Sequence, residues 1–155
     1  MPGLLIIAHF PLATALKAVA LHAFPDCSRR LEALDVLPDM SPEDIEAAAR
    51  ALLSQVRNPD ALILTDVFGA TPCNVSQRLA GQMATTTGSQ IRVVAGVNVP
   101  MLWRSLSYAD DGLDMLVARA LAGATQGVMQ LVSSRPQNQA QKPGPHDQDA
   151  HQHQQ

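Results

Sequence analysis

Two side chains capable of group-transfer chemistry each follow a short apolar segment of the chain. His9 comes directly after Gly3–Ala8 (GLLIIA), and Asp66 comes directly after Ala61–Thr65 (ALILT). A neutral imidazole is a nucleophile, and a carboxylate beside it can fix the tautomer and orientation of the ring. A single histidine after a strand is more often incidental than functional, so the meaning of His9 depends on what the fold brings to it.

The residues that follow Asp66 favour an anion-binding turn. Gly69 permits a tight backbone turn, and Thr71-Pro72 is a typical helix start. The first N–H groups of a helix have no partner within the helix, and they bind phosphate well. We therefore predict that Gly69, Ala70 and Thr71 hold a phosphoryl group while His9 carries it.

Strand-like and helix-like segments alternate along the chain. The runs Gly3–Ala8, Ala61–Thr65 and Ile91–Ala95 are continuously apolar, which is typical of strands buried on both faces, and the more mixed Arg30–Val36 (RLEALDV) indicates an edge strand. Helices are predicted for Pro11–Phe24, from Ser41, from Thr71, for Pro100–Tyr108 and for Asp111–Ala122, with a last strand at Gly127–Val132. The pattern predicts an α/β domain with a doubly wound, mainly parallel four-stranded sheet and helices on both faces.

The strand order decides whether His9 and Asp66 meet. In open α/β sheets, ligands bind beyond the carboxyl ends of the strands, where the strand order reverses. With the flavodoxin-like order 2-1-3-4, the first and third strands are neighbours. His9 and Asp66 then face each other across that crevice.

Composition excludes several classes of function. Apolar residues make up 46% and charged residues 16% of the 155 residues, as is usual for a folded water-soluble domain, and the net charge is -3. A mildly acidic chain lacks the basic surface that nucleic-acid binding needs. Cys27 and Cys73 are too few for a disulfide framework or a zinc site, and no apolar run is long enough to span a membrane. We expect a cytoplasmic protein without a metal or other cofactor, peripheral to the membrane at most.

Three stretches together resemble the mannose-type IIA domain of the phosphoenolpyruvate-dependent sugar phosphotransferase system. They are the strand that ends in His9, the block Thr65–Asn74 (TDVFGATPCN) and the block Gly96–Leu102 (GVNVPML). The resemblance extends from Gly3 to about Val132, in order and with similar spacing.

The resemblance implies a phosphotransferase with a phosphohistidine intermediate. His9 would accept a phosphoryl group from phospho-HPr, Asp66 would orient the ring, and Thr71 would hold phosphate oxygens. A separate IIB-type protein would accept the group. The resemblance also implies a homodimer in which Gly127–Val132 joins the edge of the partner's sheet as an antiparallel strand.

The chain departs from the family pattern at two places near His9. Phe10-Pro11 stands where the family often has glycine, and Ala70 replaces the second glycine of the loop. Two other phosphohistidine roles stay open: a carrier serving a dihydroxyacetone kinase, and a regulatory protein whose partner binding depends on His9 phosphorylation. G-x-G-x-x-G, Walker A and G-x-S-x-G motifs are absent, which disfavours nucleotide binding and hydrolysis.

The remaining predictions concern the chain's end and the residues around the crevice. Residues 1–133 are expected to form the phosphocarrier domain, and the Gln/His/Pro-rich residues 134–155 a disordered tail. Asn74 is expected to support its loop, and Cys73 to be buried. For Met101–Trp103 the sequence leaves open a core position or an exposed rim, and for Asn98 a place in the crevice.

Overall fold

The fold is built on a four-stranded sheet in which every neighbouring pair is parallel. The computed structural model describes residues 2–56, 58–108 and 110–132. The strands lie in the order β2-β1-β3-β4, as predicted. Their bounds are Gly3–His9 for β1, Leu31–Val36 for β2, Ala61–Thr65 for β3 and Ile91–Ala95 for β4.

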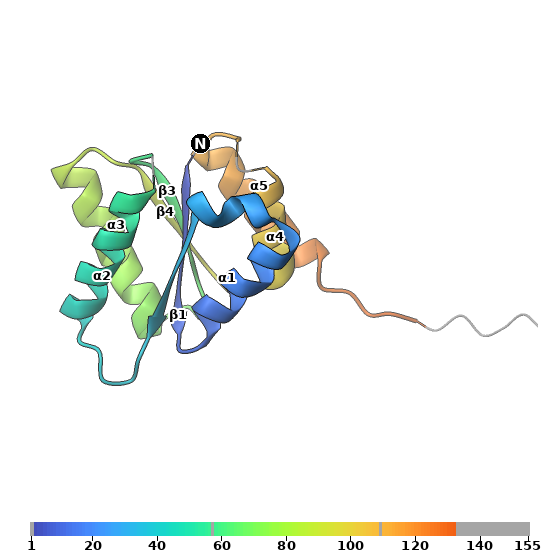
Figure 1. Cartoon of the computed structure of the whole chain (residues 1–155), viewed down its shortest axis with the longest axis horizontal. Helices are drawn as coiled ribbons and strands as arrows, with labels where there is room; N and C mark the ends of the chain where they lie inside the picture. Colours follow the sequence, from blue (N-terminus) through green and yellow to red (C-terminus); the bar gives the residue numbers. More distant parts are fainter. Residues whose placement is uncertain (1, 57, 109, 133–155) are drawn as a thin grey trace, which may run out of the picture.

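Helices cover both faces of this sheet (Figure 1). One face carries α1, α4 and α5, and the other carries α2 and α3. The helices are α1 (Leu12–Ala23), α2 (Pro42–Gln55), α3 (Thr71–Thr86), α4 (Val99–Ser107) and α5 (Leu113–Gln126). This confirms the predicted doubly wound α/β architecture. None of the described helices has the length and apolar character needed to cross a bilayer.

Strand β1 lies at the centre of two hydrophobic cores. Leu4 and Ile6 belong to the core beneath α1, α4 and α5, whereas Leu5 and Ile7 belong to the core beneath α2 and α3. All four side chains are almost completely buried, and each such burial contributes about 1.5–3 kcal/mol. The strand that ends in His9 is therefore held firmly from both sides.

Helices α1 to α4 each begin at the carboxyl end of a strand, and polar side chains fix two of these starts. At α2, the Ser41 hydroxyl accepts a hydrogen bond from the Asp44 N–H at 3.1 Å, and Pro42 follows at the first helical position. At α1, the cap comes from the neighbouring strand β2. The Asp35 carboxylate accepts hydrogen bonds from the Thr14 N–H (3.1 Å) and the Thr14 hydroxyl (2.5 Å).

Two segments differ from the sequence predictions. A short 3₁₀ helix, η1 (Pro25–Arg29), follows α1 where no element was predicted. The last strand predicted at Gly127–Val132 does not form in the described single chain, because α5 extends to Gln126 and residues 128–132 pair with no strand. In Figure 1 this segment, in orange, leads away from the sheet. The predicted tail, residues 134–155, lies outside the described residues.

Candidate active site

The structure brings His9 and Asp66 into direct contact at the carboxyl edge of the sheet. The His9 ring Nδ1 lies 2.6 Å from Oδ2 of Asp66, and the His9 backbone N–H donates to the same oxygen at 2.9 Å. The His9 side chain is 53% exposed, whereas that of Asp66 is only 13% exposed. The pair therefore presents a reactive ring to the surface on a carboxylate that is mostly covered.

Asp66 is held in its anionic form by its neighbours. Burial of the carboxyl raises its pKa, but hydrogen bonds from the His9 backbone N–H, the His9 ring and the Val67 N–H outweigh burial, so the net pKa lies below that of an ordinary aspartate. The Val67 N–H donates to Oδ1 at 2.8 Å. An anionic Asp66 accepts the proton on Nδ1 of His9, which leaves Nε2 as the ring nitrogen with a free lone pair.

Neighbouring strands set the geometry of this pair. In the register of β1 and β3, Ile7 lies opposite Thr65, so Asp66 leaves the sheet while β1 continues beside β2 to His9. The loop after β4 fixes the end of β3, because the Gly96 N–H donates to the Asp66 carbonyl and the Val97 N–H to the Thr65 carbonyl, both at 2.9 Å. Gly96 has a φ of 88°, a conformation that glycine adopts without strain.

The loop from Asp66 turns directly into α3. Gly69 adopts a φ of 85° at this turn, and the Asn74 side-chain amide donates to the Gly69 carbonyl at 3.0 Å. The expected loop-supporting role of Asn74 is thus confirmed. Ala70 is the N-cap residue of α3, and the first hydrogen bond of the helix runs from the Asn74 N–H to the Ala70 carbonyl at 3.0 Å.

Thr71 is the first residue of α3 and is exposed. Its N–H and that of Cys73 precede the helix's own hydrogen-bond ladder, and Pro72 between them has no N–H. Within the described residues, Thr71 makes no hydrogen bond to His9 or Asp66. The structure therefore joins His9 to Asp66 directly and places Gly69 and Ala70 on the loop after Asp66, with Thr71 at the start of α3.

A groove beside Thr71 was not anticipated from the sequence. It has a volume of about 350 Å³ and lies between the beginnings of α2 and α3, lined by Pro42, Thr71, Asn74, Val75 and Arg78. Arg78 is anchored by Glu46 of α2, with Nε 3.1 Å from the carboxylate. No sequence pattern predicts this ion pair, since its members are 32 residues apart along the chain.

An apolar rim also surrounds the site. We use this name for the exposed large apolar residues that directly follow β1, β2 and β3 or their neighbouring turns: Phe10, Leu12, Leu37, Val67 and Phe68. Phe68 is 78% and Phe10 60% exposed. Exposed apolar patches of this kind are typical of interaction sites.

The residues whose roles were left open take ordinary positions. Met101 and Leu102 are buried in the core, whereas Trp103 is 44% exposed on the same helix. Asn98 is the N-cap of α4, and its side-chain oxygen accepts a hydrogen bond from the Met101 N–H at 2.8 Å. Cys73 is buried, as expected.

Sequence comparison relates the chain to sugar phosphotransferase proteins. It is 31% identical over 101 residues to the PTS system mannose-specific EIIAB component of Escherichia coli (strain K12), a match that covers 63% of this chain and 30% of that protein. The same extent of match is found with the PTS system mannose-specific EIIAB component of Shigella flexneri. The matched region thus spans less than a third of the length of these relatives.

Solved structures share the fold. The phosphotransferase system component EIIA from Streptococcus agalactiae superposes with a TM-score of 0.71 at 25% identity, covering 84% of this chain and 97% of that one. The mannose/sorbose specific IIA subunit of the phosphotransferase system from Enterococcus faecalis superposes with a TM-score of 0.74 at 24% identity, covering 86% and 97%. At 24% identity, the match to the Enterococcus faecalis subunit shows a shared fold.

A family profile matches most of the chain. The profile of EIIA-man, the PTS system fructose IIA component, matches residues 3–121. This range contains the whole sheet, the His9–Asp66 pair and the loop that opens α3. The chain belongs to the EIIA-man family of phosphotransferase-system IIA components.

Proposed function

We propose that this chain is a cytoplasmic phosphocarrier of the sugar phosphotransferase system, which accepts a phosphoryl group from phospho-HPr on His9 and passes it to a separate IIB-type protein. The 2.6 Å contact between His9 Nδ1 and Asp66 carries the proposal. This contact activates one nitrogen of a ring that is half exposed. A merely structural histidine would need neither the exposure nor the fixed tautomer.

The transfer is an exchange of one P–N bond for another. His9 Nε2 attacks the phosphorus of the donor's phosphohistidine, and the donor's P–N bond breaks as the new bond forms. The electron pair of the broken bond returns to the donor ring. Asp66 keeps the Nδ1 proton in place and stabilises the positive charge that the phosphorylated His9 ring gains, as the carboxylate of a hydrolase triad does for its histidine.

The beginning of α3 supplies the charge complement for the phosphoryl oxygens. Phosphoryl transfer depends mainly on positioning and electrostatic stabilisation. The N–H groups of Thr71 and Cys73 and the positive end of the helix dipole favour an anion there. The exposed Thr71 hydroxyl adds a further donor to the same loop.

The apolar rim is the surface on which the donor protein docks in this proposal. A partner that delivers a phosphoryl group to His9 must cover Phe10 and Phe68, because Phe10 directly follows His9 and Phe68 is two residues after Asp66. Aromatic residues at the centre of an interface contribute most of its binding energy.

A phosphorylation assay tests the function. The protein is incubated with phosphoenolpyruvate, enzyme I and HPr, and the acid-labile phosphate is mapped by mass spectrometry. We expect the phosphate on His9 and no labelling of His9→Ala, while His22→Ala, which removes an exposed histidine of α1, labels fully. Normal labelling of His9→Ala, or labelling lost with His22→Ala, would refute the assignment.

We further infer that two copies of the chain associate through the segment after α5. Val128, Met129, Leu131 and Val132 are all more than half exposed, and β4 is an end strand of the sheet with one free edge. Such an edge accepts an added strand from another chain. Light scattering on Leu131→Asp/Val132→Asp should then report a monomer where the unchanged protein and Met115→Asp report a dimer. A monomeric unchanged protein would contradict this.

A further inference from the structure

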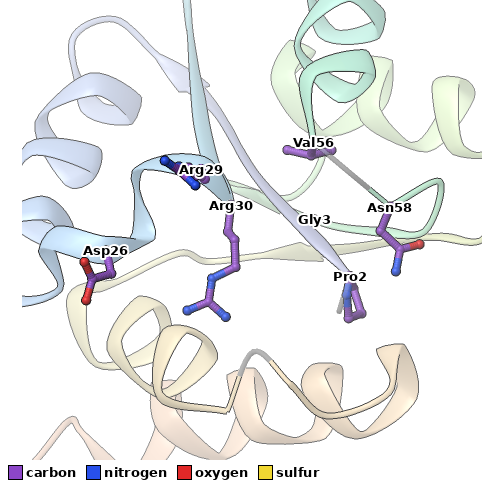
Figure 2. A pocket seen from close by; sticks show the side chains of 7 residues that line it. All are labelled: Pro2, Gly3, Asp26, Arg29, Arg30, Val56 and Asn58. Atoms are coloured by element: carbon purple, nitrogen blue, oxygen red, sulfur yellow. The ribbon is translucent and has the colours of Figure 1, made fainter.

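A cavity of about 250 Å³ lies at the amino edge of the sheet, the opposite edge from His9 (Figure 2). Its apolar wall consists of Pro2, Gly3 and Val56, all of which are buried. Its polar wall comes from η1, from the residue after it and from the loop before β3. The volume is slightly below the range of about 300–1,000 Å³ that is typical of small-molecule sites, so it suits a metabolite rather than a larger cofactor.

Backbone hydrogen bonds hold the walls of this cavity in place. The Gly3 N–H donates to the Asp60 carbonyl and the Leu4 N–H to the Arg30 carbonyl, both at 2.9 Å. The Arg30 N–H donates to the Cys27 carbonyl at 2.9 Å, and the Asn58 side-chain oxygen accepts from the Asp60 N–H at 2.9 Å. Three separate segments of the chain are thereby fixed around one space, which lowers the entropic cost of binding a ligand.

The polar wall offers both cationic and anionic groups. Arg29, Arg30 and Asn58 provide hydrogen-bond donors, and Asp26 provides an acceptor. Figure 2 shows the Arg30 side chain extending between Asp26 on one side and Pro2 and Asn58 on the other.

The Arg30 guanidinium has only a weak ion-pair partner among the described residues. Within the part of the chain that the structure describes, its nearest carboxylate is that of Asp110, which is 81% exposed. The distance of 3.7 Å is too long for a hydrogen bond. Among the described residues, Arg29 forms no ion pair. The Arg30 guanidinium is therefore available to a ligand, whereas in Figure 2 the Arg29 side chain extends away from Arg30.

We propose that this cavity binds a small phosphorylated sugar or polyol. The guanidinium fork of Arg30 matches a phosphate group, and Arg29 adds positive charge to the wall. The Asp26 carboxylate and the Asn58 amide suit hydroxyl groups, and the apolar wall suits the C–H faces of a short carbon skeleton. An acidic group beside the arginines disfavours a ligand that is anionic throughout and favours one whose second half carries hydroxyls.

The cavity is separate from the candidate active site. Gly3 begins β1 and His9 ends it, so the length of the central strand lies between the two. Binding here does not depend on His9, and the proposal stands or falls independently of the phosphocarrier function.

Calorimetric titration with glucose 6-phosphate tests the proposal on the full chain. We expect saturable binding that Arg29→Gln/Arg30→Gln weakens at least about tenfold, the loss of about one charge-assisted hydrogen bond. Arg92→Gln is the matched control, because Arg92 pairs with the exposed Asp114 and does not line the cavity. That control and His9→Ala should bind as the unchanged protein does. Thermal melts verify that each variant is folded.

Two further ligands test whether the cavity needs both the phosphate and the sugar skeleton. Glucose should bind at least about tenfold more weakly because it lacks the phosphate, and inorganic phosphate equally so because it lacks the skeleton. Three results would overturn the proposal: no saturable binding of glucose 6-phosphate, equal binding by the double arginine variant, or equal affinity for inorganic phosphate. Loss of binding in His9→Ala would place the ligand at the other edge and overturn it as well.

Discussion

The carboxyl ends and the amino ends of the strands offer different positively charged groups to an anion. At the carboxyl edge, helices begin, so free N–H groups and the positive ends of helix dipoles surround His9 and little cationic side-chain charge is needed. At the amino ends of the strands, α1 to α4 end, and among the described helices α5 alone begins there. The proposed cavity there is lined by the side chains of Arg29 and Arg30. Backbone N–H groups therefore supply most of the positive charge near His9, whereas arginine side chains supply it at the cavity.

The largest expected effect comes from neutralising the carboxyl edge. Asp66→Asn keeps the shape of the side chain but loses the charge that fixes the Nδ1 proton of His9. We expect phosphoryl transfer from phospho-HPr, followed by rapid quench, to slow by about 10²–10⁴-fold. The matched control is Asp110→Asn at the amino edge, which removes an exposed carboxylate and should leave the rate unchanged. Similar rates for both variants would remove Asp66 from the mechanism.

A substitution at the amino ends of the strands should reduce folding stability through a packing clash, without a change in chemistry. A Cβ on Gly3 would lie 2.6 Å from Cγ2 and 2.9 Å from Cβ of Val56, so Gly3→Ala forces the end of α2 away from β1. We expect the free energy of unfolding to fall by about 1–3 kcal/mol in urea titrations. Gly81→Ala, on α3 with open space around it, should instead stabilise by about 0.5–1 kcal/mol. A stable Gly3→Ala would mean that this contact is loose.

The apolar rim should affect partner binding without affecting chemistry. Phe68→Ser removes the most exposed aromatic residue of the rim, and we expect the KM for phospho-HPr to rise about tenfold with kcat nearly unchanged. Leu121→Ser, an exposed apolar residue of α5 outside the rim, is the control and should leave KM as it is. A fall in kcat alone would place Phe68 in the reaction rather than in docking.

The smallest effect concerns acid stability at the carboxyl edge. The pKa of Asp66 is lower in the folded chain than in the unfolded one, because hydrogen bonds from His9 and Val67 outweigh burial. Its contribution to stability is therefore full above the unfolded pKa of about 3.9 and is lost as the pH falls through the folded value. The difference in unfolding free energy between the unchanged protein and Asp66→Asn should shrink below about pH 4. A difference that grows on acidification would contradict the assigned direction.

Much of the fold could be predicted because its elements have local signals. The runs Ala61–Thr65 and Ile91–Ala95 coincide with β3 and β4, and Ser41-Pro42 and Thr71-Pro72 mark the starts of α2 and α3. η1 has no such signal, since five residues without a repeating apolar pattern resemble any loop. The segment 128–132 could not be judged from one chain, because an extended segment acquires its hydrogen bonds only from a neighbouring strand.

The contact between His9 and Asp66 was predictable, because it depends on the strand order. Neighbouring parallel strands end at the same side of the sheet, which brings His9 at the end of β1 close to Asp66 after β3. The apolar rim was not predictable, since Phe68 in a loop looks the same in sequence whether it is exposed or buried. Nor was the Arg78–Glu46 pair, which depends on how α2 and α3 lie against each other.

One oxygen atom at the end of β1 serves two purposes at once. Oδ2 of Asp66 accepts both the backbone N–H and the ring Nδ1 of His9. A proton added to that atom weakens its hold on the main chain and on the imidazole together. Protonation of Asp66 would thus release the His9 ring from its fixed orientation and loosen the carboxyl end of β1 in a single event.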